Sequence, residues 1–176
     1  MNEPLCFEDL RVGDRWDSPA RTITETDLVN FSCMTGDFDP LHVDHEFARR
    51  SVYRRPVAHG LLGLSFLAGL SSRSPAMCNI ALLSIRDWRF VNPLHVGDTV
   101  SVITMVKQLQ AQGRRSGRVI WHRQLVNQDE MVVQEGMLET LVEMRTAGRR
   151  DQSVPTPHVV SDQQAAGVPP SSERSR

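Results

Sequence analysis

Residues 57–70 read Val-Ala-His-Gly-Leu-Leu-Gly-Leu-Ser-Phe-Leu-Ala-Gly-Leu, so nearly every residue is apolar or glycine. A helix that is apolar on every side is typical of a buried one, and we expect this segment to form such a helix. Gly60, Gly63 and Gly69 each cost about 1 kcal/mol relative to alanine inside a helix. Close packing against a sheet, or the approach of a ligand, would explain why these positions lack side chains. The segment is too short to cross a bilayer, which needs roughly 20 apolar residues.

The chain after this helix has the pattern of an antiparallel sheet. Four runs rich in Val, Ile, Trp and Thr are separated by short segments that contain Gly, Pro, Asn or Asp. The runs are residues 80–91, 99–109, 117–127 and 131–144. The last run also fits a helical face through its glutamates, but its apolar residues share one side at period two and favour a strand. A helix followed by such a sheet predicts the α+β class.

A second helix is expected over residues 24–35. Thr24, with Asp27 three residues later, forms the pattern of a capping box, and Gly36 stands at the usual stop position. The chain then reads Gly-Asp-Phe-Asp-Pro-Leu-His over residues 36–42, and Pro40 disfavours a helical conformation at the residue before it. We therefore expect an irregular turn that holds His42 at a fixed distance from the first helix.

This turn is the densest group of polar residues, and three interpretations of it are open. It can be a solvated turn whose aspartates bond nearby backbone N–H groups. It can hold a carboxylate and an imidazole together for proton transfer. It can bind a metal through Asp37, Asp39 and His42, but two acids and a histidine on a turn match no common ligand spacing, so we predict no metal.

The pair His59-Gly60 is the second candidate feature. A histidine with its hydrogen bonds satisfied near the core, followed by a glycine chosen for packing, would explain the pair without any function. In the first turn of the buried helix, however, the backbone N–H of Gly60 has no partner within the helix and lies at the positive end of the helix dipole. A glycine at that point would let a substrate carbonyl come close.

Composition and charge exclude several other classes of protein. The formal net charge is −1, which gives no general reason to expect binding to nucleic acid or to an anionic membrane. The three cysteines, Cys6, Cys33 and Cys78, form no CxxC pair, so neither a disulfide frame nor a zinc site follows and a reducing cytoplasm fits best. Ser65 and the cysteines have no base at a known spacing, and no GxGxxG, Walker A or HExxH motif occurs. We expect no cofactor.

The length of 176 residues predicts one domain, which we place at residues 1–145. Residues 146–176 contain no Leu, Ile, Met or aromatic residue but four of the ten prolines. Such a composition cannot bury enough apolar surface to order itself, and we predict a disordered tail.

Taken in order along the chain, these motifs resemble those of the MaoC-like hydratases and dehydratases, the group that contains the R-specific enoyl-CoA hydratases. The signature of that family is a Gly-Asp-x-Asn-Pro-Leu-His turn followed by an alanine in a short helix, here residues 36–42 and Ala48. The similarity extends to residues 7–14, 22–25, 59–62 and 93–98, so it covers nearly all of residues 7–145.

The resemblance implies a hotdog fold, in which a long antiparallel sheet wraps around one central helix, here residues 57–70. Members of the family pair their sheets across a two-fold axis, and the acyl chain enters near the subunit interface. A homodimer is therefore the smallest assembly that we expect, since an unpaired sheet edge would otherwise face water.

The resemblance also implies an activity, the reversible hydration of a trans-2-enoyl-CoA to a 3-hydroxyacyl-CoA by a hydro-lyase of fatty acid metabolism. Asp37 and His42 correspond to the residues that hold the water, and the N–H of Gly60 corresponds to the donor that binds the thioester oxygen. The acyl group would arrive on coenzyme A or on acyl carrier protein, so coenzyme A is expected only as part of the substrate.

Further substrate contacts are expected beside these residues. His59 and Leu61 flank Gly60, and Arg54 and Arg55 could meet the phosphates of coenzyme A. Asp39 stands where the family signature has asparagine, which replaces a donor and acceptor with a group that only accepts when ionised. It could brace the turn, favour another acyl group or mark a weakly active member.

Two other functions remain open at this point. The same fold hosts acyl-CoA thioesterases, and fold does not determine function. A non-catalytic hotdog subunit that binds acyl groups or a partner subunit is the other, and Asp39 and the long tail motivate it.

Overall fold

The computed structural model describes residues 3–145. The predicted tail lies outside these residues, so the division of the chain at residue 145 stays a prediction. The helices are the 3₁₀ turn η1 (Phe7–Asp9), α1 (Glu25–Thr35), α2 (Pro40–Val43), α3 (His45–Arg50) and α4 (Gly60–Ser71). The strands are β1 (Arg15–Asp17), β2 (Arg21–Thr22), β3 (Asn79–Phe90), β4 (Thr99–Gln112), β5 (Ser116–Val126) and β6 (Val132–Glu143).

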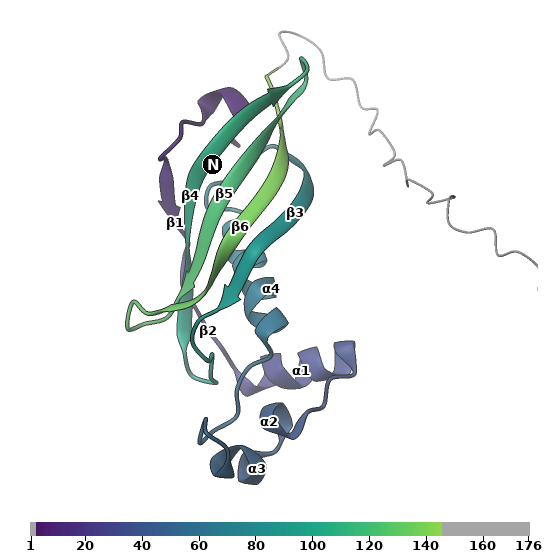
Figure 1. Ribbon diagram of the computed structural model, residues 1–176, viewed down its shortest axis with the longest axis vertical. Coiled ribbons are helices and arrows are strands. Elements are labelled where there is room, and N and C mark those ends of the chain that lie inside the picture. The colour runs from purple at the N-terminus through teal and green to yellow at the C-terminus, as the bar shows by residue number, and fades with distance from the viewer. Residues whose placement is uncertain (1–2, 146–176) are drawn as a thin grey trace, which may run out of the picture. The chain divides into compact units, whose positions relative to one another are not determined.

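The strands form one antiparallel sheet in the order β1-β4-β5-β6-β3, with β2 also paired to β4 (Figure 1). β4, β5 and β6 follow one another through short turns, as the four predicted runs indicated. The ambiguous last run is a strand, and its alternate residues Gly136, Leu138, Thr140 and Val142 are buried. The fold is the expected α+β class.

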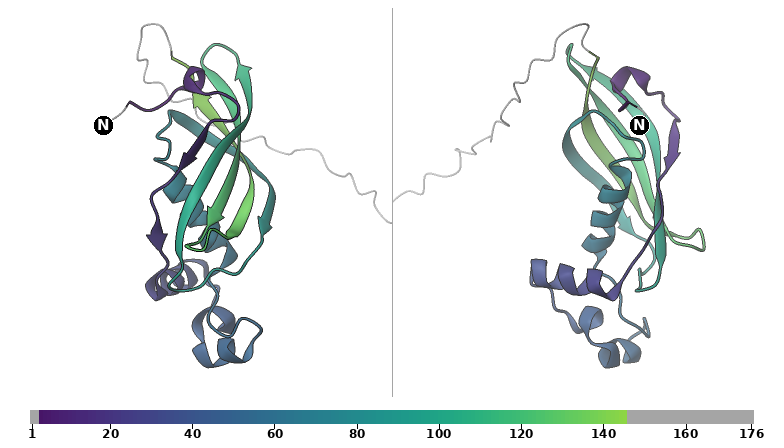
Figure 2. Two further views of the ribbon diagram at one scale, coloured as in Figure 1. Left: turned by 90° about the vertical axis from the view of Figure 1, so that its left-hand side faces the viewer. Right: turned by 180° about the vertical axis from the view of Figure 1, so that it is seen from behind.

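The central helix α4 lies against one face of this sheet, and α1, α2 and α3 lie beyond its N-terminal end (Figure 2). Leu62, Phe66 and Leu67 of α4 are buried and belong to the same hydrophobic core as the inward side chains of the strands. Among these is Trp121, which is fully buried and donates its indole N–H to Oγ1 of Thr140 at 2.8 Å. Burial of such large apolar side chains supplies about 1.5–3 kcal/mol each.

The helix starts three residues later than the apolar segment does. Val57 pairs with His95, and Ala58 donates its N–H to the carbonyl of Leu94, so these residues are extended and lie beside the turn before β4. Within the single chain, only the side of α4 that faces the sheet is buried, and Leu61 on its other side is 60% exposed. None of the helices among residues 3–145 is long and apolar enough to cross a membrane.

The first long helix follows its predicted boundaries. Thr24 caps α1 by accepting the N–H of Asp27, and the Asp27 carboxylate accepts the N–H of Thr24, which confirms the capping box. Gly36 ends the helix in the left-handed conformation at φ 79°, where glycine meets no steric penalty. The exit angle of the chain toward the polar turn is set at this residue.

Candidate active site

The polar turn joins α1 to the short helix α2 and carries two of the predicted catalytic residues. Asp39 caps α2, since its Oδ1 accepts the N–H of Leu41 at 2.8 Å. Pro40 is the first residue of α2, where the missing N–H would have had no partner within the helix. Asp37 therefore lies before α2, and His42 lies within it, one turn after the cap.

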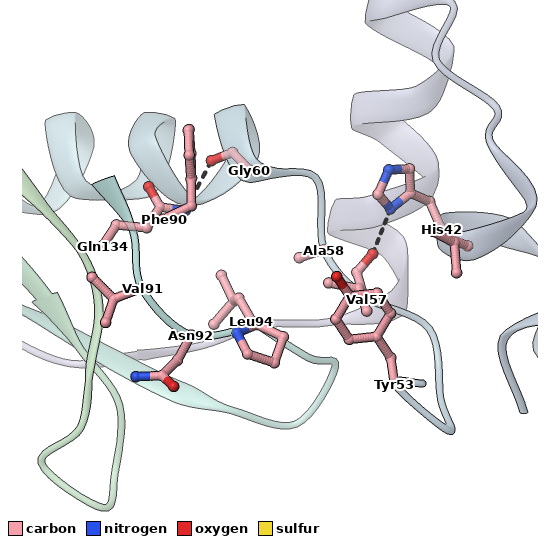
Figure 3. A pocket seen from close by; sticks show the side chains of 12 residues that line it. His42, Tyr53, Val57, Ala58, Gly60, Phe90, Val91, Asn92, Leu94 and Gln134 are labelled. Carbon is pink, nitrogen blue, oxygen red and sulfur yellow. Dashed lines mark hydrogen bonds between the residues drawn. The ribbon is translucent and has the colours of Figure 1, made fainter. Parts of the chain in front are cut away.

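The imidazole of His42 faces the carboxylate of Asp37 through Nε2. On its other side, Nδ1 lies 2.6 Å from the carbonyl oxygen of Val57 (Figure 3). A carbonyl oxygen only accepts, so Nδ1 carries the proton, and in the neutral ring Nε2 has a free lone pair. Nε2 lies 4.0 Å from Oδ2 of Asp37. Two groups at this separation can both bond to one water molecule between them.

His59 adjoins this pair and is almost completely buried, with 3% of its surface exposed. Its ring stacks on that of His42 with the ring centroids 3.7 Å apart and the planes inclined by 29°. Its Nε2 lies 3.0 Å from the carbonyl oxygen of Asp37 and 3.2 Å from Oγ of Ser32, a buried residue of α1. His59 thus contacts both residues of the predicted catalytic pair.

A cavity of about 320 Å³ lies beside His42 and the start of α4. His42, Tyr53, Gly60, Phe90 and Gln134 line it, and Figure 3 shows these residues, which come from α2, the segment before α4, the start of α4, β3 and β6. The predicted catalytic histidine and the predicted oxyanion donor therefore share one cavity.

The first turn of α4 is held in place by residues of the sheet. The carbonyl of Gly60 accepts a hydrogen bond from Nε2 of Gln134 at 2.9 Å, and Oε1 of Gln134 lies 3.3 Å from the indole nitrogen of Trp88, which donates to it. A Cβ added to Gly60 would lie 2.8 Å from Cε1 of Phe90. The glycine therefore lets the Phe90 ring pack against the helix start, while the N–H of Gly60 lacks an acceptor within the helix.

The remaining predicted substrate contacts do not line this cavity. Asp39 is exposed, and its N–H donates to Oδ1 of Asp37 at 3.3 Å, so it braces the turn. Leu61 lies on the exposed side of α4. Arg54 is exposed with φ 66°, and Arg55 lies 3.9 Å from Oδ1 of Asp98. Their predicted roles in binding substrate stay predictions.

Asp37, His42 and His59 also form a group with one possible metal-ligand atom each, all within 4.8 Å of one another. The lone pair of an imidazole nitrogen lies in the plane of its ring, and the two rings are stacked face to face. Nε2 of His59 faces the carbonyl oxygen of Asp37 and therefore carries a proton, which leaves this nitrogen no lone pair for an ion. That this group binds no metal stays a prediction.

Several residues of the site had not been singled out from the sequence: Ser32, Tyr53, Trp88, Phe90 and Gln134. For Gln134 the sequence did contain a signal of a special role, because Gln134 is a polar residue in the run Val-Val-Gln of a strand whose neighbouring apolar residues face the core. The others have ordinary residue types for their elements.

Comparison with known proteins identifies the family of the chain. The family model of the MaoC like domain matches residues 10–127. The chain belongs to the MaoC-like family. Protein MaoC of Klebsiella aerogenes is 36% identical to this MaoC-like chain over 110 residues. These residues are 62% of the chain and 33% of that protein, so the chain matches about a third of its relative's length. The (R)-specific enoyl-CoA hydratase of Rhodospirillum rubrum is 33% identical over 104 residues, 58% of the chain and 70% of that protein.

Solved structures support the same assignment. The MaoC-like dehydratase from Rhodospirillum rubrum has a TM-score of 0.71 and 28% identity to the MaoC-like chain, covering 81% of the chain and 99% of its own length. Rv0216 from Mycobacterium tuberculosis, described as a double hotdog fold, has a TM-score of 0.76 at 21% identity over 84% of the chain and 47% of that protein. The predicted hotdog fold is confirmed.

Proposed function

We propose that this MaoC-like chain is a hydro-lyase that adds water reversibly to a trans-2-enoyl-CoA to give a 3-hydroxyacyl-CoA. The observation that carries the proposal is the free lone pair of His42 Nε2, which faces Asp37 beside a cavity that Gly60 also lines. The hydratase and dehydratase names of its relatives support the reaction class.

The thioester binds with its carbonyl oxygen at the N–H of Gly60. Addition of water to the β-carbon moves negative charge onto that oxygen. A fixed donor at the positive end of α4 stabilises this charge in the transition state more than in the ground state, and such a donor is worth about 3–4 kcal/mol of the barrier.

Asp37 and His42 act on the water that lies between them. The water oxygen bonds to the β-carbon as its proton moves to Nε2 of His42, and the imidazolium then gives that proton to the α-carbon. The carbonyl of Val57 keeps Nδ1–H bonded throughout, and the Asp37 carboxylate orients the water and pairs with the imidazolium. Proton transfer of this kind contributes about 10²–10⁴ in rate.

The active assembly is proposed to be a homodimer. Among residues 3–145, β3 pairs only with β6, and its other edge has no neighbouring strand. Ile80 and Leu82 of β3 are 48% and 56% exposed, and Leu61 of α4 is likewise exposed. A second copy would cover these apolar side chains and the sheet edge. Light scattering coupled to gel filtration should give twice the mass of the chain, and a stable monomer would contradict the dimer.

The carrier of the acyl group is proposed to be coenzyme A, held near Arg54 and Arg55, with no separate cofactor. These arginines follow Tyr53, which lines the cavity. Arg55→Ala should raise KM for an acyl-CoA with little change in kcat. If Arg55→Ala and the wild-type protein have equal KM values, or if only thioesters of acyl carrier protein react, the assignment of coenzyme A as the carrier is wrong.

The function is tested by following the absorbance of the enoyl thioester with crotonyl-CoA and with longer or branched analogues. Loss of the enoyl absorbance without release of free thiol supports a hydratase. Release of free thiol would instead indicate the thioesterase, and a purified protein without turnover on the whole panel would favour the non-catalytic subunit.

A further inference from the structure

We infer that His59 is a positioning residue that holds Asp37, His42 and the N–H of Gly60 in one arrangement, an inference that rests on the proposed function. The sequence predicted that His59 contacts the substrate. However, His59 is buried and is not among the residues that line the cavity. It contacts the proposed catalytic residues Asp37 and His42, together with Phe31 and Ser32 of α1.

The first contact holds the backbone of Asp37. The carbonyl oxygen of Asp37 only accepts, so Nε2 of His59 carries a proton and donates it. Oγ of Ser32 lies close enough to share the same N–H. His59, at the start of α4, is thereby linked to the polar turn and to the end of α1, whose residues Asp37 and Ser32 lie 22 and 27 positions away in the chain.

The second contact restricts the ring of His42. A stacked ring 3.7 Å away leaves His42 little room to tilt, and the bond from Nδ1 to the Val57 carbonyl prevents rotation about the ring axis. Together they aim Nε2 at Asp37. The backbone of His59 adds the third link, because its carbonyl carbon forms the peptide bond whose N–H belongs to Gly60.

Two substitutions separate these contacts. His59→Phe keeps an aromatic ring to stack on His42 but removes the N–H, and His59→Gln keeps a donor but removes the ring. Displacing catalytic groups by about 1 Å can cost on the order of 10² in rate. We expect each variant to lose about 10- to 100-fold in kcat while KM for the enoyl-CoA changes less than about twofold. Ser32→Ala, a smaller change, should lose less.

A matched control is His95→Gln. His95 is also buried, and its Nδ1 also bonds to a backbone carbonyl, that of Pro56, at 2.8 Å. Loss of the His95 side chain should lower the melting temperature as much as loss of the His59 side chain does, but it should leave kcat unchanged. If the His59 variants raise KM and keep kcat, His59 binds substrate, and the inference is overturned; unchanged kinetics would overturn it as well.

A measurement that needs no activity separates this inference from the proposed function. The ring proton signals of His42, assigned with His42→Gln, should move in His59→Gln because the ring current of the stacked imidazole is lost, and should stay in place in His95→Gln. If the wild-type protein hydrates no thioester, the proposed function fails. The spectra then still test whether His59 positions the ring of His42. His42 signals that do not move would overturn it.

A second, independent observation concerns two cysteines. The Sγ atoms of Cys6 and Cys78 lie 3.5 Å apart, although the residues are 72 positions apart in the chain. Leu5 and Met77 form a parallel bridge next to them, with hydrogen bonds of 2.9 Å from Leu5 to Ala76 and from Cys78 to Leu5. The backbone therefore holds the two thiols together.

The structure assigns Cys6 and Cys78 as a dithiol site that a hydroperoxide oxidises to a disulfide. One thiol, as thiolate, attacks a peroxide oxygen, and with hydrogen peroxide this step releases water and leaves a sulfenic acid. The other thiol attacks that sulfur, forms the S–S bond and releases a second water. The two thiols lose two electrons and two protons, and the peroxide is reduced to two waters.

The test treats the Cys33→Ser protein with excess hydrogen peroxide, because Cys33 is exposed and could otherwise link two chains. We expect the loss of both free thiols, a mass lower by two hydrogen atoms, a peptide pair joined through Cys6 and Cys78, and a melting temperature raised by several degrees that dithiothreitol reverses. Cys6→Ser or Cys78→Ser should abolish all four effects. Thiols that stay free, or that are oxidised separately without a bond between them, would overturn the assignment.

Discussion

Nε2 of His42 lies 4.0 Å from Oδ2 of Asp37, with its lone pair free because Nδ1 donates to the Val57 carbonyl. This distance is too long for a direct hydrogen bond and suits a shared water molecule. In the proposed reaction, the water molecule that is consumed lies between these two groups. Gly60 and His42 line the same cavity.

Gly60→Ala should lower kcat/KM by about 10-fold or more, because the new methyl group and the Phe90 ring cannot both keep their places. Adding Phe90→Ala should restore part of the loss. Gly69→Ala is the matched control in the same helix, since a Cβ there meets nothing within 4 Å, and it should stabilise the protein by about 1 kcal/mol without changing kcat. Equal activity of Gly60→Ala and wild type would contradict the account of this position.

Asp39→Asn should keep both activity and stability. The carboxylate caps α2 through one oxygen, and the amide oxygen of asparagine can accept the same N–H of Leu41. Asp39→Ala removes the acceptor and should cost about 1 kcal/mol in the free energy of unfolding. Urea titration and the hydration assay measure both effects, and a large loss of activity in Asp39→Asn would show that the charge itself is required.

Gln134→Met should lower the free energy of unfolding by about 1–3 kcal/mol, because it leaves the Gly60 carbonyl and the Trp88 indole N–H without their partner. The start of α4 loses its support, so kcat should fall too. Gln110→Met, at an exposed position of β4, provides the control. A Gln134→Met protein as stable as this control would refute the role of the amide.

The thiol of Cys6 should react slowly near neutral pH. Burial, together with the hydrogen bond and charge of Cys78, raises its pKa from the ordinary 9.0 to about 11. The rate of alkylation by iodoacetamide should therefore keep rising until about pH 11. The folded state favours the protonated thiol, so this contribution to stability is present below pH 9.0 and is lost as pH rises through about 11. Cys6→Ser should lack both effects, and a rate that levels off near pH 9.0 would contradict the shift.

The features that could be predicted from the sequence are local ones. The capping residues set the ends of α1, and alternation of apolar residues identified the strands, because each signal acts within a few positions. Asp37 and His42 come close because they lie only five residues apart, on a turn whose path is restricted by Pro40 and by the Asp39 cap. Family resemblance supplied the fold around them.

Contacts between distant elements could not be predicted in the same way. The bond from His59 to Ser32 and the bond from Gln134 to Gly60 join residues 27 and 74 positions apart, and they depend on how α1 and the sheet pack against α4. The cysteines show the same limit, since two thiols that are scattered along the sequence meet when the N-terminal segment pairs beside β3. The expected cytoplasmic location and the tail stay predictions.

The most direct measurement compares hydration of crotonyl-CoA by the wild-type protein and by the double variant Asp37→Asn, His42→Gln. His45→Gln serves as the control, since this exposed histidine pairs with Glu25 away from the cavity. The account predicts an active wild type and control, and a double variant that folds normally but is slower by about 10² or more. A folded double variant with wild-type activity would contradict it.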